Sequence, residues 1–523
     1  MISNIGHLFR LGRAGFVFVR EGVFGQIDPL IVPAPMRGAL GVVRMFERRS
    51  SAQSNTRLAT ALTQLGPTYV KLGQFLATRP DVVGPALARD LSSLQDRMEP
   101  IAQHEAEAVV ASALGRPIAE VFSSFGPAVA AASIAQVHRA EITTAEGSHP
   151  VAVKVLRPGI ERRFRIDLAS FYFAARNAEQ RSSEARRLRL VQVVDTLARS
   201  VAMEMDLRLE AAAMSEMEEN IRDDADFRVP TLDWDRTAKD VLTLDWIEGA
   251  PLSDRAGLIA RGINLEELGR TLMQSFLRHA LRDGFFHADM HPGNLFVGED
   301  GRLVAVDFGI MGRLEPKERR FLAEILYGFI TRNYRRTAEV HFEAGYVPSH
   351  HSVDNFAQAI RAIGEPIHNR SAEEISMAKL LTLLFEVTGL FDMRTRPELL
   401  LLQKTMVVVE GVARSLDPKL DIWAVAGPVV REWVERHLGP AGRLEDATEG
   451  VSEIGRFVGA VPALLGRAAG LADQVDTMTR DGLVLAPETV QAIGRAEARH
   501  NRGIAMALWV IAALLVWLVL FAD

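Results

Sequence analysis

Apolar and polar residues recur with different periods along the chain, and each period indicates a different kind of element. Residues 1–100 have a helical pattern, mixed apolar and basic at first and then broken by pairs such as Gly66-Pro67. Between about 120 and 155 the pattern becomes strand-like, and a helical period returns from about 160 to 221. Short strands follow at 241–247, 294–297 and 303–308, the last two joined by a turn with Gly298, Asp300 and Gly301, and a helical stretch runs from Gly312 to about 436.

This order of elements predicts an α+β fold in which a small sheet-containing lobe precedes a larger helical lobe. The segment after the helical lobe is rich in Gly and Ala with alternating charge, which favours a helical linker. The predicted parts are a helical N-terminal extension at 1–118, a sheet-containing N-lobe at 119–250, a helical C-lobe at 251–436, the linker at 437–503 and a transmembrane helix at 504–522.

The transmembrane helix is predicted because residues 504–522 are consecutive apolar residues, a length that crosses a bilayer as one helix. Arg495, Arg499 and Arg502 precede this segment, so the positive-inside bias places the preceding domain in the cytoplasm. A buried core helix is the alternative, and the absence of a polar face argues against it.

Composition narrows the classes of partner. The chain has 523 residues, a formal charge of -6 and 48% hydrophobic residues, close to a soluble globular average and without the basic excess of a nucleic-acid-binding protein. There is no cysteine, which excludes disulfides, thiol catalysis and cysteine-ligated metals. Partners must therefore be recognised by local sites.

The N-terminal stretch 1–24 does not have the unbroken apolar core of a signal peptide, because Arg10, Arg13 and Arg20 interrupt it. Its aromatic residues among these arginines allow it to lie on anionic lipid. A helix that faces a protein core explains the pattern equally well.

The stretch G-F-F-H-A-D-M-H-P-G-N-L-F-V at 284–297, followed by V-A-V-D-F-G-I at 304–310, carries the strongest chemical pattern. Its spacing matches the catalytic loop and D-F-G of protein kinases. Phosphoryl transfer needs a carboxylate that orients the attacking group and oxygen ligands that hold Mg²⁺ against the phosphates. We predict that Asp289 orients the attacking hydroxyl or water and that Asn294 and Asp307 are the metal ligands.

Two alternatives apply to this loop. His287, Asp289 and His291 form an H-x-D-x-H pattern that could bind zinc, or they could be ordinary polar loop residues. Neither alternative predicts a D-F-G at the right distance. His287 is therefore expected to orient the loop.

Lys154 lies in V-A-V-K-V at 151–155 and matches the strand lysine that binds nucleotide phosphates in kinases. A solvated strand edge is the alternative, but the flanking valines and the order of the motifs favour a catalytic lysine. Its acidic partner is expected on the helical stretch 204–213, where Glu204, Asp206 and Glu210 are the candidates.

The run V-A-A-A-S-I-A-Q-V-H-R-A at 129–140 precedes Lys154 and raises a choice between a helix and a nucleotide loop without glycines. The motifs that follow it favour the loop. Alanine disfavours positive φ and close backbone approach, so we expect a stiff loop with few free amides and slow turnover. The predicted nucleotide-binding residues are Ala131, Ala132, Ser133, Ile134, Ala135, Gln136, Val137, His138, Arg139 and Lys154.

Taken together, the motifs resemble the UbiB family of atypical protein-kinase-like proteins, also called ADCK proteins, over roughly residues 60–420. The resemblance rests on Y-V-K-L-G-Q-F-L-A-T-R-P-D at 69–81, the alanine-rich loop, the E-x-D of Glu204 to Asp206, and H-A-D-M-H-P-G-N. It implies a kinase-like bilobal fold and selects Glu210, just after the E-x-D, as the partner of Lys154 in the nucleotide site.

The resemblance also implies a function. In this family the K-x-G-Q helix covers the pocket where a protein kinase binds its peptide, so Lys71, Gln74, Glu204 and Asp206 are expected to line that occlusion. The implied activity is an ATPase that supports ubiquinone biosynthesis, with ATP and Mg²⁺ as cofactors. The implied partners are isoprenoid quinone precursors, the enzymes that modify them and membrane lipid, without nucleic acid.

The implied location is the bacterial inner membrane, with a single C-terminal span and a cytoplasmic kinase-like domain. Two other functions remain open at this point: a lipid-binding pseudokinase scaffold without turnover, and a true small-molecule phosphotransferase. The sequence leaves open the acceptor, the partner enzymes and the oligomeric state, a homodimer included.

Overall fold

The structure is a computed structural model that describes residues 2–23, 54–77, 98–145, 147–366, 389–393 and 397–439, with isolated positions between 83 and 94 and at 387. The chain divides into two units, Met1–Val434 and Glu435–Asp523, and the elements below belong to the first except for the end of the last helix. No helix within the described ranges is long and apolar enough to cross a membrane. The predicted transmembrane helix at 504–522 and nearly all of the predicted linker lie outside these ranges.

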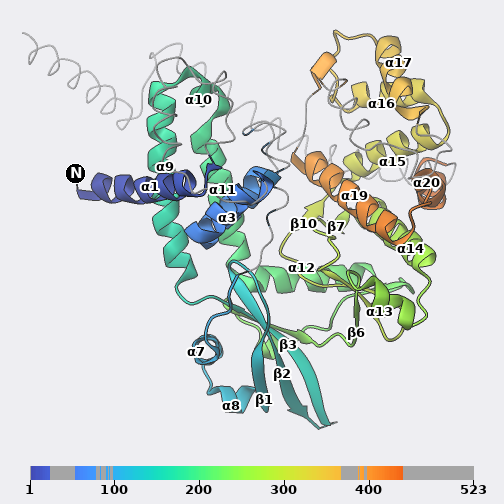
Figure 1. The fold of residues 1–523 in the computed structure, drawn as a ribbon. Coiled ribbons are helices and arrows are strands. Elements are labelled where there is room, and N and C mark those ends of the chain that lie inside the picture. Colours follow the sequence, from blue (N-terminus) through green and yellow to red (C-terminus); the bar gives the residue numbers. More distant parts are fainter. Residues whose placement is uncertain are drawn as a thin grey trace, which may run out of the picture. The chain divides into compact units, whose positions relative to one another are not determined.

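The N-terminal extension is helical, as predicted (Figure 1). Its second and third helices meet at Gly66, which has a φ of +103°, a backbone conformation that glycine adopts readily. Pro67 is the first residue of the third helix, a position where the missing N–H of proline costs nothing. The ring of Tyr69 packs edge-on against Phe171 of the long helix α9, with centroids 5.2 Å apart. The extension helices are α1 (Ile2–Arg20), α3 (Ser54–Leu65) and α4 (Pro67–Ala77), and α9 (Ile160–Arg181) comes later in the chain, after the first strands.

The N-lobe sheet is antiparallel with strand order β1-β2-β3-β5. Strand alternation explains the position of the lysine. Val151, Val153 and Val155 point to one face, where they pack with Val110 in a buried core, and Lys154 points to the other. The elements are α7 (Gln103–Leu114), α8 (Ile118–Val121), β1 (Ser124–Ala131), β2 (Ala135–Thr144), β3 (Gly147–Leu156) and β5 (Val241–Asp245).

Helices fill most of the chain from Ile160 to Asn220, in agreement with the helical period of the sequence. Asp206 caps the last of them by accepting a hydrogen bond from the backbone N–H of Arg208 at 3.2 Å. These elements are α10 (Ser183–Leu188), α11 (Leu190–Glu204), α12 (Leu207–Asn220), β4 (Phe227–Arg228) and η2 (Trp234–Arg236).

The C-lobe holds two small sheets and a set of helices. The predicted hairpin is present: β8 and β9 are antiparallel, with Leu295 opposite Ala305. One sheet has the order β4-β9-β8-β6 and the other pairs β7 with β10. The elements are β6 (Gly249–Pro251), α13 (Arg255–Ala260), α14 (Leu265–Arg278), the π-helical turn η3 (His279–Asp283), β7 (Phe285–His287), β8 (Leu295–Gly298), β9 (Leu303–Ala305), β10 (Met311–Arg313), α15 (Pro316–Ile330), α16 (Tyr334–Glu343), α17 (Val353–Gly364), α19 (Pro397–Leu416) and α20 (Ile422–Leu438).

Candidate active site

The site forms around Lys154, which β3 presents to the helix α12 and to the end of the β8–β9 hairpin. The Lys154 ammonium donates to both carboxylate oxygens of Glu210, at 2.8 and 2.9 Å, and lies 3.1 Å from Oδ1 of Asp307. Of the three acidic candidates for its partner, the structure therefore places Glu210 on Lys154. This contact agrees with the assignment that the family resemblance made.

Charge pairing dominates the electrostatics of these groups. Burial lowers the pKa of Lys154, but the carboxylates of Asp307 and Glu210 outweigh it and raise that pKa, so the lysine stays a cation. Burial raises the pKa of Glu210, which the Lys154 charge and a hydrogen bond from the Phe308 backbone oppose. Partial burial also raises the pKa of Asp307, but the Lys154 charge overcomes this and lowers it to about 2, with Lys71 contributing. Asp307 is therefore ionised at neutral pH.

The catalytic loop begins where β7 ends, and His287 fixes its path. Its Nε2 donates to the carbonyl of Val306 at 3.1 Å, and its Nδ1 accepts from the backbone N–H of Asp289 at 3.1 Å. The imidazole is buried, which lowers its pKa and keeps it neutral. The prediction that His287 orients the loop agrees with these contacts.

The same contacts argue against the zinc alternative. Both ring nitrogens of His287 are engaged by the backbone, so neither has a free lone pair directed at an ion. Nε2 of His291 lies 3.8 Å from Asp289, and its Nδ1 accepts from the backbone N–H of Gly293. Among the residues that the structure describes, these three do not group as metal ligands.

Asn294, just before β8, and Asp307, just after β9, lie together at the open end of the β8–β9 hairpin. Asn294 is buried, and its Nδ2 donates to the carbonyl of Asp289 at 3.0 Å, which leaves its amide oxygen available. The N–H of Val306 donates to the Asn294 carbonyl at 2.9 Å. Asp307 has a φ of +64°, rare for a non-glycine residue, and its side chain is 49% exposed. An amide oxygen and an accessible carboxylate are donors that fit Mg²⁺.

A helix of the C-terminal part supports this loop, and sequence reasoning missed it. Thr405 of α19 is fully buried, and its one hydroxyl proton is shared between the carbonyl of Leu401 in the same helix, at 2.8 Å, and the carbonyl of Ala288, immediately before Asp289, at 3.1 Å. The residue stands out in the sequence as a hydroxyl inside a largely apolar helix. We infer that α19 positions the catalytic loop through this bond.

The alanine run is not a helix: it forms the hairpin of β1 and β2, with Ala132, Ser133 and Ile134 between the strands. The backbone N–H of Ala132 donates to the carbonyl of Ala135 at 2.8 Å, so this amide is already used. The carbonyl of Ala131 accepts from the N–H of Met98 at 3.1 Å. These bonds agree with the predicted stiffness of the loop.

Arg157, just beyond β3, fastens the same turn and was not foreseen from the sequence. Its Nε donates to the carbonyl of Ala132 at 3.0 Å, and its backbone N–H donates to the carbonyl of Ile134 at 2.8 Å. Its Nη2 donates to the carbonyl of Glu99 at 2.8 Å, which ties the turn to the chain ahead of α7.

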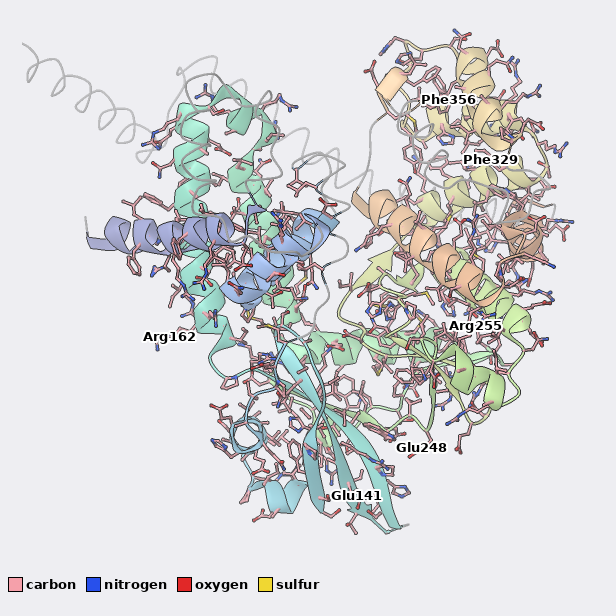
Figure 2. The ribbon with its side chains drawn as sticks, viewed as in Figure 1. Glu141, Arg162, Glu248, Arg255, Phe329 and Phe356 are labelled. Carbon is pink, nitrogen blue, oxygen red and sulfur yellow. The ribbon has the colours of Figure 1, made fainter. Side chains whose placement is uncertain are left out.

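The rest of the predicted nucleotide segment lies along β2. Val137 is opposite Lys154 in the sheet. Gln136 and His138 are buried and 2.6 Å apart, His138 donates to the carbonyl of Gly126 at 2.9 Å, and burial lowers the pKa of its imidazole. Arg139 lies over the ring of Trp246 and 3.6 Å from Glu248, which is labelled in Figure 2.

Replacing Ala132 with glycine is expected to loosen this turn and to change ATP affinity relative to ADP. Glycine opens backbone conformations that alanine disfavours, so the turn could present more amides to the terminal phosphate. Fluorescence titration with both nucleotides measures the ratio of the two affinities. An Ala128→Gly variant within β1 controls for a general loss of stability, and an unchanged ratio in Ala132→Gly would remove the loop from nucleotide selection.

The K-x-G-Q residues lie on α4. Lys71 forms an ion pair with Glu204 at 2.5 Å, and both side chains are largely buried. Its charge also lowers the pKa of Asp307, which places this helix electrostatically beside the site. Gln74 is half-buried on the same helix, whereas Asp206 pairs with Arg208 at 2.7 Å and caps α12.

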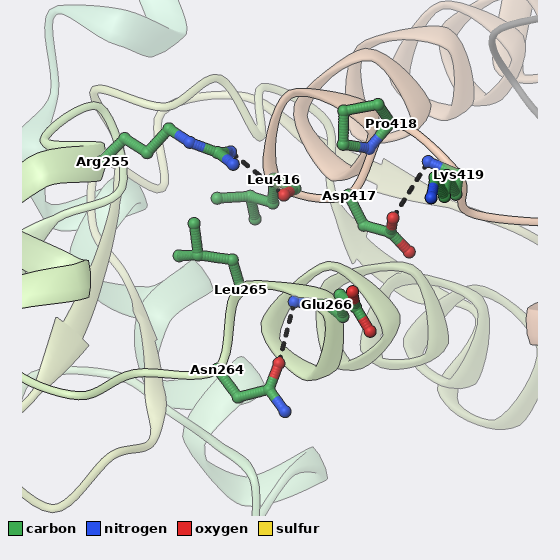
Figure 3. Close-up of a pocket in the computed structure, with 8 residues that line it drawn as sticks. All are labelled: Arg255, Asn264, Leu265, Glu266, Leu416, Asp417, Pro418 and Lys419. Atoms are coloured by element: carbon green, nitrogen blue, oxygen red, sulfur yellow. Dashed lines mark hydrogen bonds between the residues drawn. The ribbon is translucent and has the colours of Figure 1, made fainter.

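A pocket of about 350 Å³ lies elsewhere in the C-lobe, between the start of α14 and the end of α19 (Figure 3). Arg255 donates there to the carbonyl of Leu416 at 3.0 Å and so caps α19. Asn264 caps α14. The side chains of Arg255 and Asn264 in this pocket thus hydrogen-bond to helix ends. None of the site residues described above lines the pocket.

A strand lysine paired with a helix glutamate, a D-F-G aspartate beside it and a catalytic loop define an atypical protein-kinase-like domain. In agreement, residues 93–341 match the ABC1 atypical kinase-like domain and residues 360–421 match the UbiB helical domain. The chain belongs to the UbiB family. It is 39% identical to a probable protein kinase UbiB of Marinobacter nauticus over 84% of this chain and 81% of that protein. It is 40% identical to the protein of the same name from Azotobacter vinelandii, over 84% and 82%.

A solved structure supports the fold. The chain is similar to Rv3197 of Mycobacterium tuberculosis, determined in complex with erythromycin, with 27% identity and a TM-score of 0.52. The match covers 72% of this chain and 95% of that chain. The predicted kinase-like fold with a sheet-containing N-lobe is therefore confirmed.

Proposed function

We propose that this protein is a membrane-anchored, kinase-like ATPase that supports ubiquinone biosynthesis, acting on or near isoprenoid quinone precursors and the enzymes that modify them. The observation that carries the proposal is the Lys154 ammonium held between Glu210 and Asp307. A protein that only assembled partners would have no need for a charged lysine, two carboxylates and a positioned catalytic loop together.

The side chains divide the work of ATP hydrolysis. Lys154, kept in place by Glu210, binds phosphate oxygens, and Asp289 orients the attacking water. Asn294 and Asp307 would hold Mg²⁺, which neutralises charge on the phosphates. His287 and Thr405 keep Asp289 in place through the peptide bond between Ala288 and Asp289: His287 accepts from its N–H and Thr405 donates to its carbonyl.

Hydrolysis is favoured over transfer to a protein because α4 carries its own charged residue next to the site. Lys71 is held by Glu204, and its charge reaches Asp307. This arrangement supports the proposal for Lys71 and Glu204, whereas the occluding role of Gln74 and Asp206 stays a prediction. The apolar segment 504–522 would keep the domain beside precursors that reside in the bilayer.

Quinone content in a strain that lacks this protein tests the biological role. We expect the deletion to lose ubiquinone, the wild-type chain to restore it, and Asp307→Asn to fail at equal protein level. Asp235→Asn, an exposed aspartate of the N-lobe, is the matched control. Full restoration by Asp307→Asn would favour the lipid-binding scaffold without turnover, and normal ubiquinone in the deletion strain would refute the proposed role.

A further inference from the structure

A cluster of metal-binding side chains lies in the C-lobe and plays no part in the site above. His350 and His351 come from the loop between α16 and α17, and Asp392 comes from the segment ahead of α19. Nε2 of His351 lies 3.3 Å from Oδ2 of Asp392, and Nε2 of His350 lies 3.8 Å from the same oxygen. Each residue offers one donor atom, and all these atoms lie within 4.8 Å of one another.

We propose that His350, His351 and Asp392 bind a divalent transition-metal ion such as Zn²⁺. Two imidazole nitrogens and one carboxylate oxygen are the usual donors for such ions, whereas Mg²⁺ and Ca²⁺ prefer oxygen alone. In a tetrahedral site with metal–ligand distances near 2.0–2.1 Å, two donors are about 3.3 Å apart. The spacing of 3.3 Å between His351 and Asp392 matches this value, and rotation of the exposed His350 side chain would bring its Nε2 closer than the present 3.8 Å.

The position of Asp392 is set by the protein core. Its neighbour Phe391 is buried in a cluster with Tyr334, Val347 and Phe356, the last of which is labelled in Figure 2. The ring of His351 lies 5.3 Å from the ring of Phe391. Because packing in this core cluster fixes Phe391, the next residue, Asp392, lies beside the two histidines even though its own side chain is exposed.

Two local features fit an ion better than a plain surface ion pair. The rings of His350 and His351 are only 4.1 Å apart, which places two imidazole ligands together beside one carboxylate. Asp392 has a φ of +47°, a conformation that is uncommon in a non-glycine residue. The side chains of His350 and Asp392 are 66% and 69% exposed, which leaves room for a water ligand and a path for entry.

The ion would cross-link two segments of the chain, because His351 and Asp392 are 41 residues apart in sequence. One follows α16, and the other stands five residues before Pro397, the first residue of α19. Thr405 of that helix holds the carbonyl of Ala288 in the catalytic loop. Metal binding would therefore brace the part of the C-lobe from which the loop is supported.

Equilibrium dialysis of the full chain without an affinity tag, with Zn²⁺ in excess Mg²⁺, tests the proposal. An Asp307→Asn background removes any contribution from the nucleotide site. We expect one Zn²⁺ more per chain in this background than in the same background carrying His351→Ala or Asp392→Ala, and His149→Ala, an exposed histidine of β3, should retain it.

Two further measurements make the result decisive. Co²⁺ in place of Zn²⁺ should give visible absorption bands that disappear in His350→Gln, a substitution at an exposed position that leaves the fold intact. The thermal midpoint of the parent chain should rise with Zn²⁺ and that of His350→Gln should not. Equal Zn²⁺ stoichiometry and equal Co²⁺ spectra in the parent and the His350→Gln chain would overturn the proposal.

Discussion

Lys154→Met is expected to abolish nucleotide binding and to lower the free energy of unfolding by about 3–5 kcal/mol. The side chain of Glu210 is only 7% exposed, and both its carboxylate oxygens accept from the Lys154 ammonium. Removing the cation leaves a buried carboxylate without its partner, while methionine keeps most of the volume. Chemical denaturation and a nucleotide-binding titration measure the two effects separately.

The double variant Lys154→Met/Glu210→Leu separates stability from function. With both charges replaced by apolar groups, the unfolding free energy should recover much of the loss, because a buried pair can be exchanged for apolar packing at little cost. Nucleotide binding should stay absent. Recovery of binding in the double variant would show that Lys154 does not contact the phosphates.

Asp289→Asn is expected to lower ATP turnover by about 10²–10⁴-fold, the usual contribution of a positioned acid or base, with ATP affinity retained. Asparagine keeps the shape of the side chain, and the backbone N–H at this position still donates to His287. Its amide cannot take a proton from the attacking water. Steady-state phosphate release gives the turnover, and a binding titration gives the affinity.

Asp235→Asn serves as the control for this substitution, since it makes the same chemical change at an exposed position. Unchanged turnover in Asp289→Asn would move the water-orienting role to another group. A loss of affinity equal to the loss of turnover would assign Asp289 to binding.

The sequence predicted the site well where chemistry constrains spacing. The sequence spacing of three residues, Asp289, Asn294 and Asp307, predicted a loop followed by a hairpin that brings them together. The structure has that hairpin. The choice of Glu210 came from the resemblance, because helical spacing alone left Glu204 and Asp206 as equal candidates. Glu204 instead binds Lys71 and Asp206 caps a helix.

Local pattern was ambiguous where long-range contacts decide. The strand-like pattern at 120–155 is present, but alanine fits both helix and strand, so the run at 129–140 by itself left a helix and a loop open; pairing with β3 and the bonds from Arg157 determine its hairpin. Arg157 and Thr405 act by donating hydrogen bonds to backbone carbonyls. The spacing of side chains in the sequence does not indicate such a role. The predicted membrane segment at 504–522 lies outside the residues that the structure describes.

The central claim is that Lys154 and Asp307 belong to a working nucleotide site. The most direct measurement is Mg²⁺-dependent phosphate release from ATP by the full chain in liposomes that contain a precursor-like phenol, compared with Asp307→Asn. We predict turnover by the wild-type chain that requires Mg²⁺ and falls by at least about 100-fold in the variant, because a metal ligand contributes several kcal/mol to stabilisation of the transition state. Equal phosphate release by the two proteins would contradict it.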